Sequence, residues 1–93
     1  MSAYPATIKD RAQTSQLIRM TRAALGLTQG EFGNRYHYTA GAVGAWEKGT
    51  SLPPMSVRRD CIEIMKEAVR ASIRLENDIQ KYFGEMYANR RTE

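Results

Sequence analysis

The chain has 93 residues, of which 42% are hydrophobic and 26% charged, so it suffices for one small domain and is too apolar for wholesale disorder. One cysteine and one histidine exclude an internal disulfide and a zinc site of the usual ligand spacing, and we expect no metal and no cofactor. No stretch approaches the roughly 18 apolar residues of a membrane span, and the N-terminus lacks the apolar core of a secretory signal. We therefore expect a cytoplasmic protein with no membrane partner.

The net charge of +4 is distributed unevenly along the chain. Residues 1–59 carry eight basic and three acidic side chains, a net of +5, whereas residues 60–93 carry six basic and seven acidic side chains, a net of −1. A basic first part indicates a polyanionic partner such as nucleic acid, although a basic surface that only maintains solubility is about as common.

The first 25 residues predict an arm followed by a helix. Residues 1–13 are polar and show no sustained periodicity, which predicts a flexible N-terminal arm. A helix is predicted over residues 16–25, because Ile18 and Leu25 lie on one face, and Gly26 is well placed to end it.

A second helix begins with the clearest local signal in the chain, a capping box. The Thr28 hydroxyl can accept a hydrogen bond from the amide of Glu31, and the Glu31 carboxylate can accept one from the amide of Thr28. This helix is predicted to run to about Tyr36. Gly33 costs about 1 kcal/mol relative to alanine inside a helix, so we expect another helix to approach closely there.

A third helix is predicted over residues 40–48, after a turn at His37 and Tyr38. Thr39 caps its N-terminus and Gly49 ends it. Two short helices joined by so few residues must cross steeply, which is the helix-turn-helix arrangement. The side chains that their spacing places in the core are Phe32, Tyr36, Val43 and Trp46.

Residues 56–93 contain no proline and a single glycine, and they predict one long helix or two helices with a break near residues 74–77. Their apolar stripe is too long for three short helices to cover. We expect it to form the interface of a homodimer, with folding back onto a monomeric core as the alternative. The stripe consists of Ile62, Met65, Val69, Leu75, Ile79, Tyr82 and Met86.

Residues 17–54 resemble the DNA-binding domain of the phage lambda repressor and Cro proteins, the XRE-type helix-turn-helix family. The match needs no gap from Leu27 to Pro53. The resemblance implies an all-α, lambda-repressor-like fold for residues 14–55, followed by a C-terminal dimerisation segment over residues 56–93. The matching features are Leu-Thr-Gln at residues 27–29, a small residue at Gly33, the Thr39 cap, inward Val43 and Trp46, and then Glu47 and Gly49.

The resemblance also implies roles for individual residues. Arg22 and Glu47 match a structural salt bridge between the first helix and the end of the third. The positions that read base edges in the major groove are matched by Thr39, Ala40, Gly41, Ala42 and Ala45. The positions that contact DNA phosphates are matched by Gln29, Tyr38, Lys48, Thr50 and Ser51.

Four positions depart from the family pattern. His37 replaces the usual turn glycine, which makes a positive φ less comfortable, and Tyr38 stands where the family usually buries valine. Ala40 and Gly41 replace polar reading residues, which weakens hydrogen-bonded readout and leaves methyl contact and groove shape. Cys61 is expected to be a small buried residue rather than a reactive thiol.

These features favour a sequence-specific regulator of transcription that binds double-stranded DNA. We expect a homodimeric repressor of phage or mobile-element origin that occludes a near-palindromic operator, associates with the nucleoid and gains groove contacts from Lys9 and Arg11. The alternatives are an antitoxin or adaptor whose C-terminal helix binds a different protein, and a helix-turn-helix kept only for protein contacts. We expect no catalytic residue and no small-molecule ligand, because the chain has no clustered carboxylate pair or phosphate-cradling loop.

Overall fold

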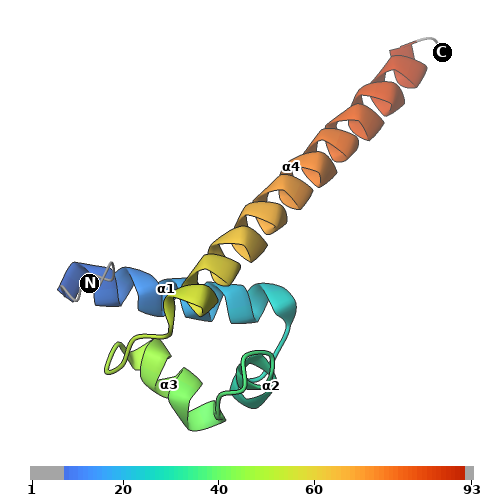
Figure 1. Cartoon of the computed structure of the whole chain (residues 1–93). Coiled ribbons are helices and arrows are strands. Elements are labelled where there is room, and N and C mark those ends of the chain that lie inside the picture. The colour runs from blue at the N-terminus through green and yellow to red at the C-terminus, as the bar shows by residue number, and fades with distance from the viewer. Residues whose placement is uncertain (1–7, 92–93) are drawn as a thin grey trace.

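The computed structural model describes residues 8–91 of the chain. They form four helices, α1 (Ile8–Leu25), α2 (Gln29–Asn34), α3 (Ala40–Lys48) and α4 (Met55–Arg91), with no strand among them (Figure 1). The expected all-α class is confirmed. No helix in this part of the chain is long and apolar enough to cross a membrane.

Helix α1 begins at Ile8, eight residues before the predicted start at Gln16. The expectation of a flexible arm is therefore wrong for residues 8–13, and residues 1–7 lie outside the described part. The periodicity of apolar residues missed this first half because polar residues make its contacts: Thr14 and Ser15 are both buried. The other end agrees with the prediction, since Gly26 follows α1 with a φ of 67°.

Helix α2 starts as predicted and ends two residues early, at Asn34. Both bonds of the capping box form, at 3.1 Å from the Glu31 amide to the Thr28 hydroxyl and 2.9 Å from the Thr28 amide to the Glu31 carboxylate. The α2 helix stops because the turn folds back over it: the Tyr38 amide donates to the Gly33 carbonyl at 2.9 Å.

Gly33 is explained by this turn rather than by a neighbouring helix. A Cβ at this position would lie 2.4 Å from the carbonyl oxygen of Tyr38 and 3.1 Å from that of Thr39. The prediction of a close approach is correct, but the atoms that approach belong to the backbone leading into α3.

The core is shared by all four helices. Phe32, Val43 and Trp46 are buried as predicted, whereas Tyr36 is half-buried and its hydroxyl donates a hydrogen bond to the Asp60 carboxylate at the start of α4. The buried apolar residues are Ile18, Phe32, Val43, Trp46, Val57 and Cys61.

Helix α1 lies between α4 and the α2–α3 pair, because it packs against both α3 and α4 (Figure 1). Helix α4 is a single unbroken helix that projects away from the others and makes the molecule 66 Å long. The alternative in which this segment folds back as two helices is wrong. Leu75 is 61% exposed and Tyr82 is 62% exposed, so most of the predicted stripe is uncovered in the single chain.

Candidate nucleic-acid interface

Helix α3 has the bounds that its sequence predicts. The Thr39 hydroxyl accepts a hydrogen bond from the Ala42 amide at 3.1 Å, which caps the N-terminus, and Gly49 closes the helix with a φ of 79°. Val43 and Trp46 bury the inner face, while Ala40 and Gly41 on the outer face are exposed. A short helix is thus fixed from one side and open on the other.

The turn before α3 contains a non-glycine residue with a positive φ, at the position where the family usually has glycine. His37 has a φ of 64°, the left-handed conformation that glycine adopts without steric cost. Tyr38 is 40% exposed, and its ring packs edge-on against the Trp46 ring with centroids 5.1 Å apart. The predicted phosphate contact of Tyr38 therefore has to come from a side chain that also covers the core.

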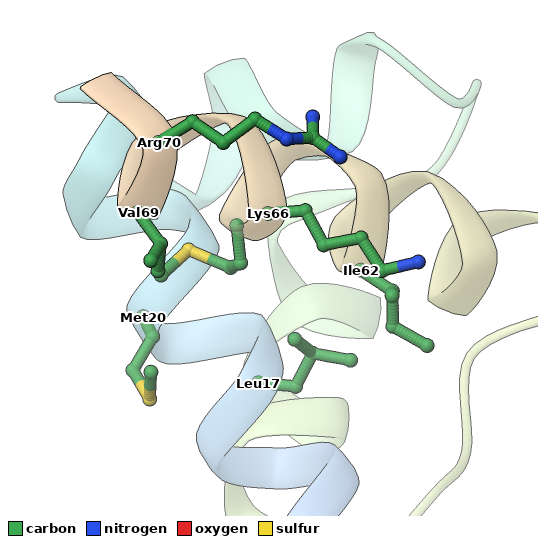
Figure 2. A pocket seen from close by; sticks show the side chains of 7 residues that line it. Leu17, Met20, Ile62, Lys66, Val69 and Arg70 are labelled. Carbon is green, nitrogen blue, oxygen red and sulfur yellow. The ribbon is translucent and has the colours of Figure 1, made fainter. Parts of the chain in front are cut away.

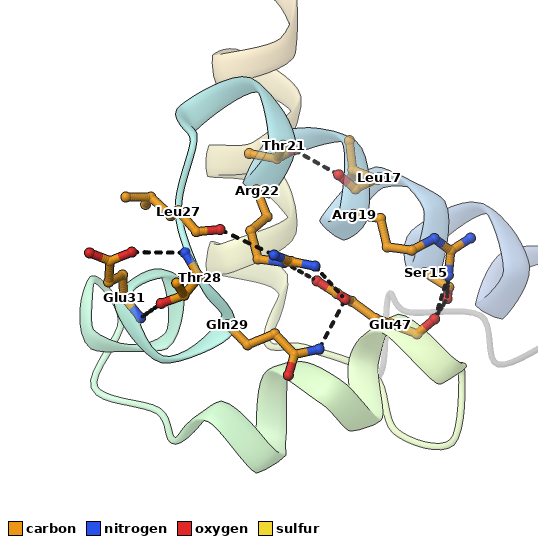
Figure 3. Close-up of polar contacts among 10 residues, drawn as sticks. All are labelled: Ser15, Leu17, Arg19, Thr21, Arg22, Leu27, Thr28, Gln29, Glu31 and Glu47. Atoms are coloured by element: carbon orange, nitrogen blue, oxygen red, sulfur yellow. Dashed lines mark hydrogen bonds and ion pairs between the residues drawn. The ribbon is translucent and has the colours of Figure 1, made fainter.

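Glu47 joins the three short helices through its carboxylate (Figure 3). Arg22 of α1 donates from Nε to Oε2 at 2.6 Å and from Nη2 to Oε1 at 3.2 Å, so the predicted salt bridge is confirmed. Gln29 of α2 donates from Nε2 to Oε1 at 3.2 Å. Since Glu47 is only 8% exposed, these donors replace the water that the carboxylate loses.

Burial alone would raise the pKa of Glu47, but hydrogen bonds from Arg22 and Gln29 and the nearby guanidinium charges outweigh burial and lower the pKa below its ordinary value. The hydrogen bond to Glu47 likewise raises the pKa of Arg22. The pair is therefore fully charged near neutral pH, and it fixes α3 relative to α1 and α2.

The main-chain carbonyl of Glu47 is held by two further residues of α1. Ser15 donates from Oγ and Arg19 donates from Nη1, and Arg19 also donates to the Ser15 hydroxyl at 3.0 Å (Figure 3). Carbonyls in the last turn of a helix lack partners within the helix, so these donors cap the C-terminus of α3. Sequence reasoning missed both residues, although a serine and an arginine four positions apart share a helix face.

A hollow of about 340 Å³ on the outer side of α3 brings together six of the predicted site residues. Residues predicted to face the bases and residues predicted to contact phosphates both line this hollow, together with Gly44, which was not predicted. A Cβ on Gly44 would lie 3.7 Å from the Gln29 amide group, an ordinary van der Waals distance, so the Gln29 side chain lies directly beside this glycine. The residues that line the hollow are Gln29, Ala40, Gly41, Gly44, Ala45, Lys48 and Thr50.

Four predicted site residues lie outside this hollow. Ala42 was predicted to face the bases, but it is half-buried and packs against the core. The Thr39 hydroxyl is engaged in capping α3. Tyr38 packs on Trp46, and Ser51 is exposed beyond the end of the helix. The outward face is consequently narrower than predicted.

A second hollow, of about 560 Å³, lies on the other side of Lys48, between α1 and the end of α3. Arg11, Arg19 and Lys48 place three cationic side chains around it. Arg11 was predicted to contact a groove from a flexible arm, whereas here it is part of α1. Lys48 borders both hollows, so the positive charge continues from the face of α3 onto α1.

No family model, curated protein sequence or solved structure matches this chain.

Proposed function

We propose that this protein is a sequence-specific regulator that binds double-stranded DNA, of the XRE-type helix-turn-helix family, and that it acts as a dimeric repressor of phage or mobile-element origin. The observation that carries the proposal is the arrangement of α3. Its inner face is fixed by the core and by Glu47, its outer face is free of large side chains, and cationic and hydrogen-bonding groups lie at the edges of that face.

The outer face of α3 would enter the major groove. Ala40, Gly41, Gly44 and Ala45 let the helix backbone approach the bases closely, and the alanine methyl groups can contact thymine methyl groups. None of these side chains can form a hydrogen bond to a base edge. Selectivity would then come from methyl contacts and from the shape and deformability of the groove.

Contacts to DNA phosphates would position α3 in the groove. Lys48 supplies a flexible charge at the end of the helix, and Thr50 and Ser51 supply hydroxyl groups in the loop that follows. The Gln29 side-chain nitrogen has two N–H donors and gives one to Glu47, which leaves one for a phosphate. Arg11 and Arg19 would extend the same contacts along the backbone.

Dimerisation would use the uncovered face of α4. Two copies related by a two-fold axis would bind a near-palindromic operator with half-sites about 34–36 Å apart, and bound protein would exclude RNA polymerase by occlusion. The predicted dimer contacts Leu75, Ile79 and Tyr82 are all exposed in the single chain and therefore available.

The proposal is tested by selecting bound sequences from random double-stranded DNA and then measuring affinity by fluorescence anisotropy at several salt concentrations. Lys48→Ala should lower the affinity and reduce the salt slope by about 1, because one phosphate contact is lost. Lys81→Ala removes the same charge from the exposed C-terminal part of α4 and should change neither quantity. The proposal is wrong if wild-type protein shows no salt-sensitive binding to any DNA.

The same uncovered face favours a second function, that of an antitoxin or adaptor that binds a different protein through α4 and uses DNA binding for autoregulation. Helix α4 exposes Leu75, Tyr82 and Tyr87 by about 60% each, an unusual display of large apolar side chains. Stoichiometric co-purification of an unlike chain, together with the absence of homodimers, would favour this function over the first.

A further inference from the structure

Helix α4 carries an unbroken heptad pattern beyond the point where α1 covers it. Alternating steps of three and four residues connect Met65, Ala68, Ser72, Leu75, Ile79, Tyr82 and Met86. These positions are the a and d sites of a coiled coil, with Met65 at a and Ala68 at d. We call them the seam. None of them is charged, and the large ones beyond Ala68 are exposed or half-buried in the single chain.

The charges of α4 are concentrated away from the seam. Glu67 accepts from Arg70 at 3.3 Å and from Arg74 at 3.0 Å, and these three residues occupy the outer c and f positions. Such pairs stabilise an exposed helix without a partner. These ion pairs support the helical conformation of the exposed part of α4, and the seam itself carries no charge.

The seam begins as the face that packs on the body of the molecule. Cys61, the d position one heptad before Ala68, is fully buried there. Leu17 and Met20 of α1 then line an apolar hollow of about 500 Å³ with Ile62, Met65 and Val69 of α4, next to the start of the exposed seam (Figure 2). The apolar surface is thus continuous from the core to the free part of α4.

The direction of α4 decides how two copies can pair. Helices α3 and α4 both pack against α1, and α4 extends away from α1 on the side opposite to α3 (Figure 1). The face of α3 that carries Val43 and Trp46 is buried in the core, so the exposed face of α3 looks away from the rest of the molecule. The 37-residue helix is roughly 55 Å long at 1.5 Å per residue. Antiparallel pairing would place the two α3 helices at opposite ends of this rod, facing opposite ways.

We infer that α4 pairs with α4 of a second copy as a parallel, in-register coiled coil along the seam, which puts both α3 helices at the same end facing the same way. This inference rests on the proposed function for the choice of direction. The residues flanking the seam allow self-pairing. In a parallel pair Asp78 faces Phe83 of the second copy and Ala71 faces Glu76, so no two carboxylates are brought together.

Disulfide trapping tests the inference with the full chain. Ser72 lies at an a position and is exposed, so Ser72→Cys should leave the fold intact and place two thiols across the seam. Mild oxidation should convert most of this variant from the 10.5 kDa chain to a covalent species of twice that mass, with residue 72 linked to residue 72 in peptide mass spectra. Asn77→Cys, at an outer f position, should remain a single chain under the same conditions.

Wild-type protein is the control for Cys61, which is buried and should not cross-link. Sedimentation of wild-type protein should show a dimer. A dimer without the link between two residues 72 would mean antiparallel or staggered pairing, and a monomer would mean no pairing; either result overturns the inference. A linked dimer whose wild-type parent binds no DNA would retain the inference and refute the proposed function.

Discussion

At the scale of single residues, Glu47 has the largest structural role in the candidate interface. Its carboxylate and its carbonyl together accept hydrogen bonds from Arg22, Gln29, Ser15 and Arg19, which lie on two other helices. The salt bridge to Arg22 could be expected from the family resemblance. The two bonds to the carbonyl could not, because they depend on how α1 crosses the end of α3.

Replacing Glu47 by glutamine should destabilise the fold, because the half-buried Arg22 guanidinium loses its charged partner. We expect a loss of about 1–3 kcal/mol in the free energy of unfolding, measured by urea denaturation followed by circular dichroism. Glu67→Gln breaks only exposed ion pairs on α4, which water screens, and should therefore change the free energy of unfolding much less than Glu47→Gln does. Equal losses in the two variants would contradict the structural role of Glu47.

The lowered pKa of Glu47 predicts a dependence of stability on pH. A carboxyl group whose folded pKa lies below its unfolded value of about 4.5 stabilises the folded state above the unfolded pKa, and this contribution is lost as pH falls through the folded pKa. Glu31 and Glu67, whose pKa values are also lowered by hydrogen bonds, contribute to the acid loss of the wild type. The difference in unfolding free energy between wild type and Glu47→Gln should therefore shrink below pH 4.5, and a constant difference down to pH 2 would count against this assignment.

At the scale of elements, the helix ends that are set by neighbouring residues could be predicted from the sequence. The capping box of α2, the bounds of α3 and the glycine after α1 all depend on residues within one turn of the helix end, and all three agree with the structure. The early start of α1 and the continuity of α4 were not settled by the sequence. The first depends on buried polar residues, and the second on whether the far part of the segment packs back onto the other helices, which periodicity does not reveal.

Gly33 packs against the turn between α2 and α3, whereas Gly84 lies on the exposed part of α4, so replacing each by alanine should have opposite effects. Gly33→Ala would push a methyl group against the Tyr38 carbonyl and should cost about 1–3 kcal/mol in unfolding free energy, as overpacking does. Gly84→Ala, in a helix with nothing within 4 Å, should stabilise by up to about 1 kcal/mol. Thermal melts of both variants decide the matter, and a neutral Gly33→Ala would show that the turn is not tightly packed.

The outer face of α3 predicts a change of specificity. Ala40→Gln adds a side chain that can form two hydrogen bonds to a base edge, so the sequences selected from random DNA should differ from those of the wild type. Ala88→Gln places the same group on an exposed part of α4 and should leave the selected sequences unchanged. An unaltered preference in Ala40→Gln would argue against placing this face in the groove.

At the scale of the whole molecule, the positive charge and the exposed apolar surface lie on different parts of the chain. The body holds the net positive charge and the free face of α3, while the projecting part of α4 holds the apolar seam and a charge close to balance. Because most of the seam projects beyond α1, the proposed pairing and the proposed DNA binding can be altered independently. The apolar stripe could be predicted from periodicity, but its separation from α3 depends on the direction in which α4 leaves α1.

Because the seam lies away from α3, a substitution in the seam should affect how two copies bind one operator together without changing the contacts of either copy. Leu75→Glu would place two carboxylates opposite each other at a d position of the proposed pair, so this variant should sediment as a monomer whereas we expect the wild type to sediment as a dimer. Asn77→Glu adds the same charge at an outer position and should leave the dimer intact. Since the body of Leu75→Glu is unchanged, each copy should still contact a half-site, but binding to the full operator should weaken by about 10²–10⁴, because linkage of the two half-sites is lost. Full-operator affinity equal to that of the wild type in a monomeric Leu75→Glu protein would show that pairing through α4 does not serve DNA binding.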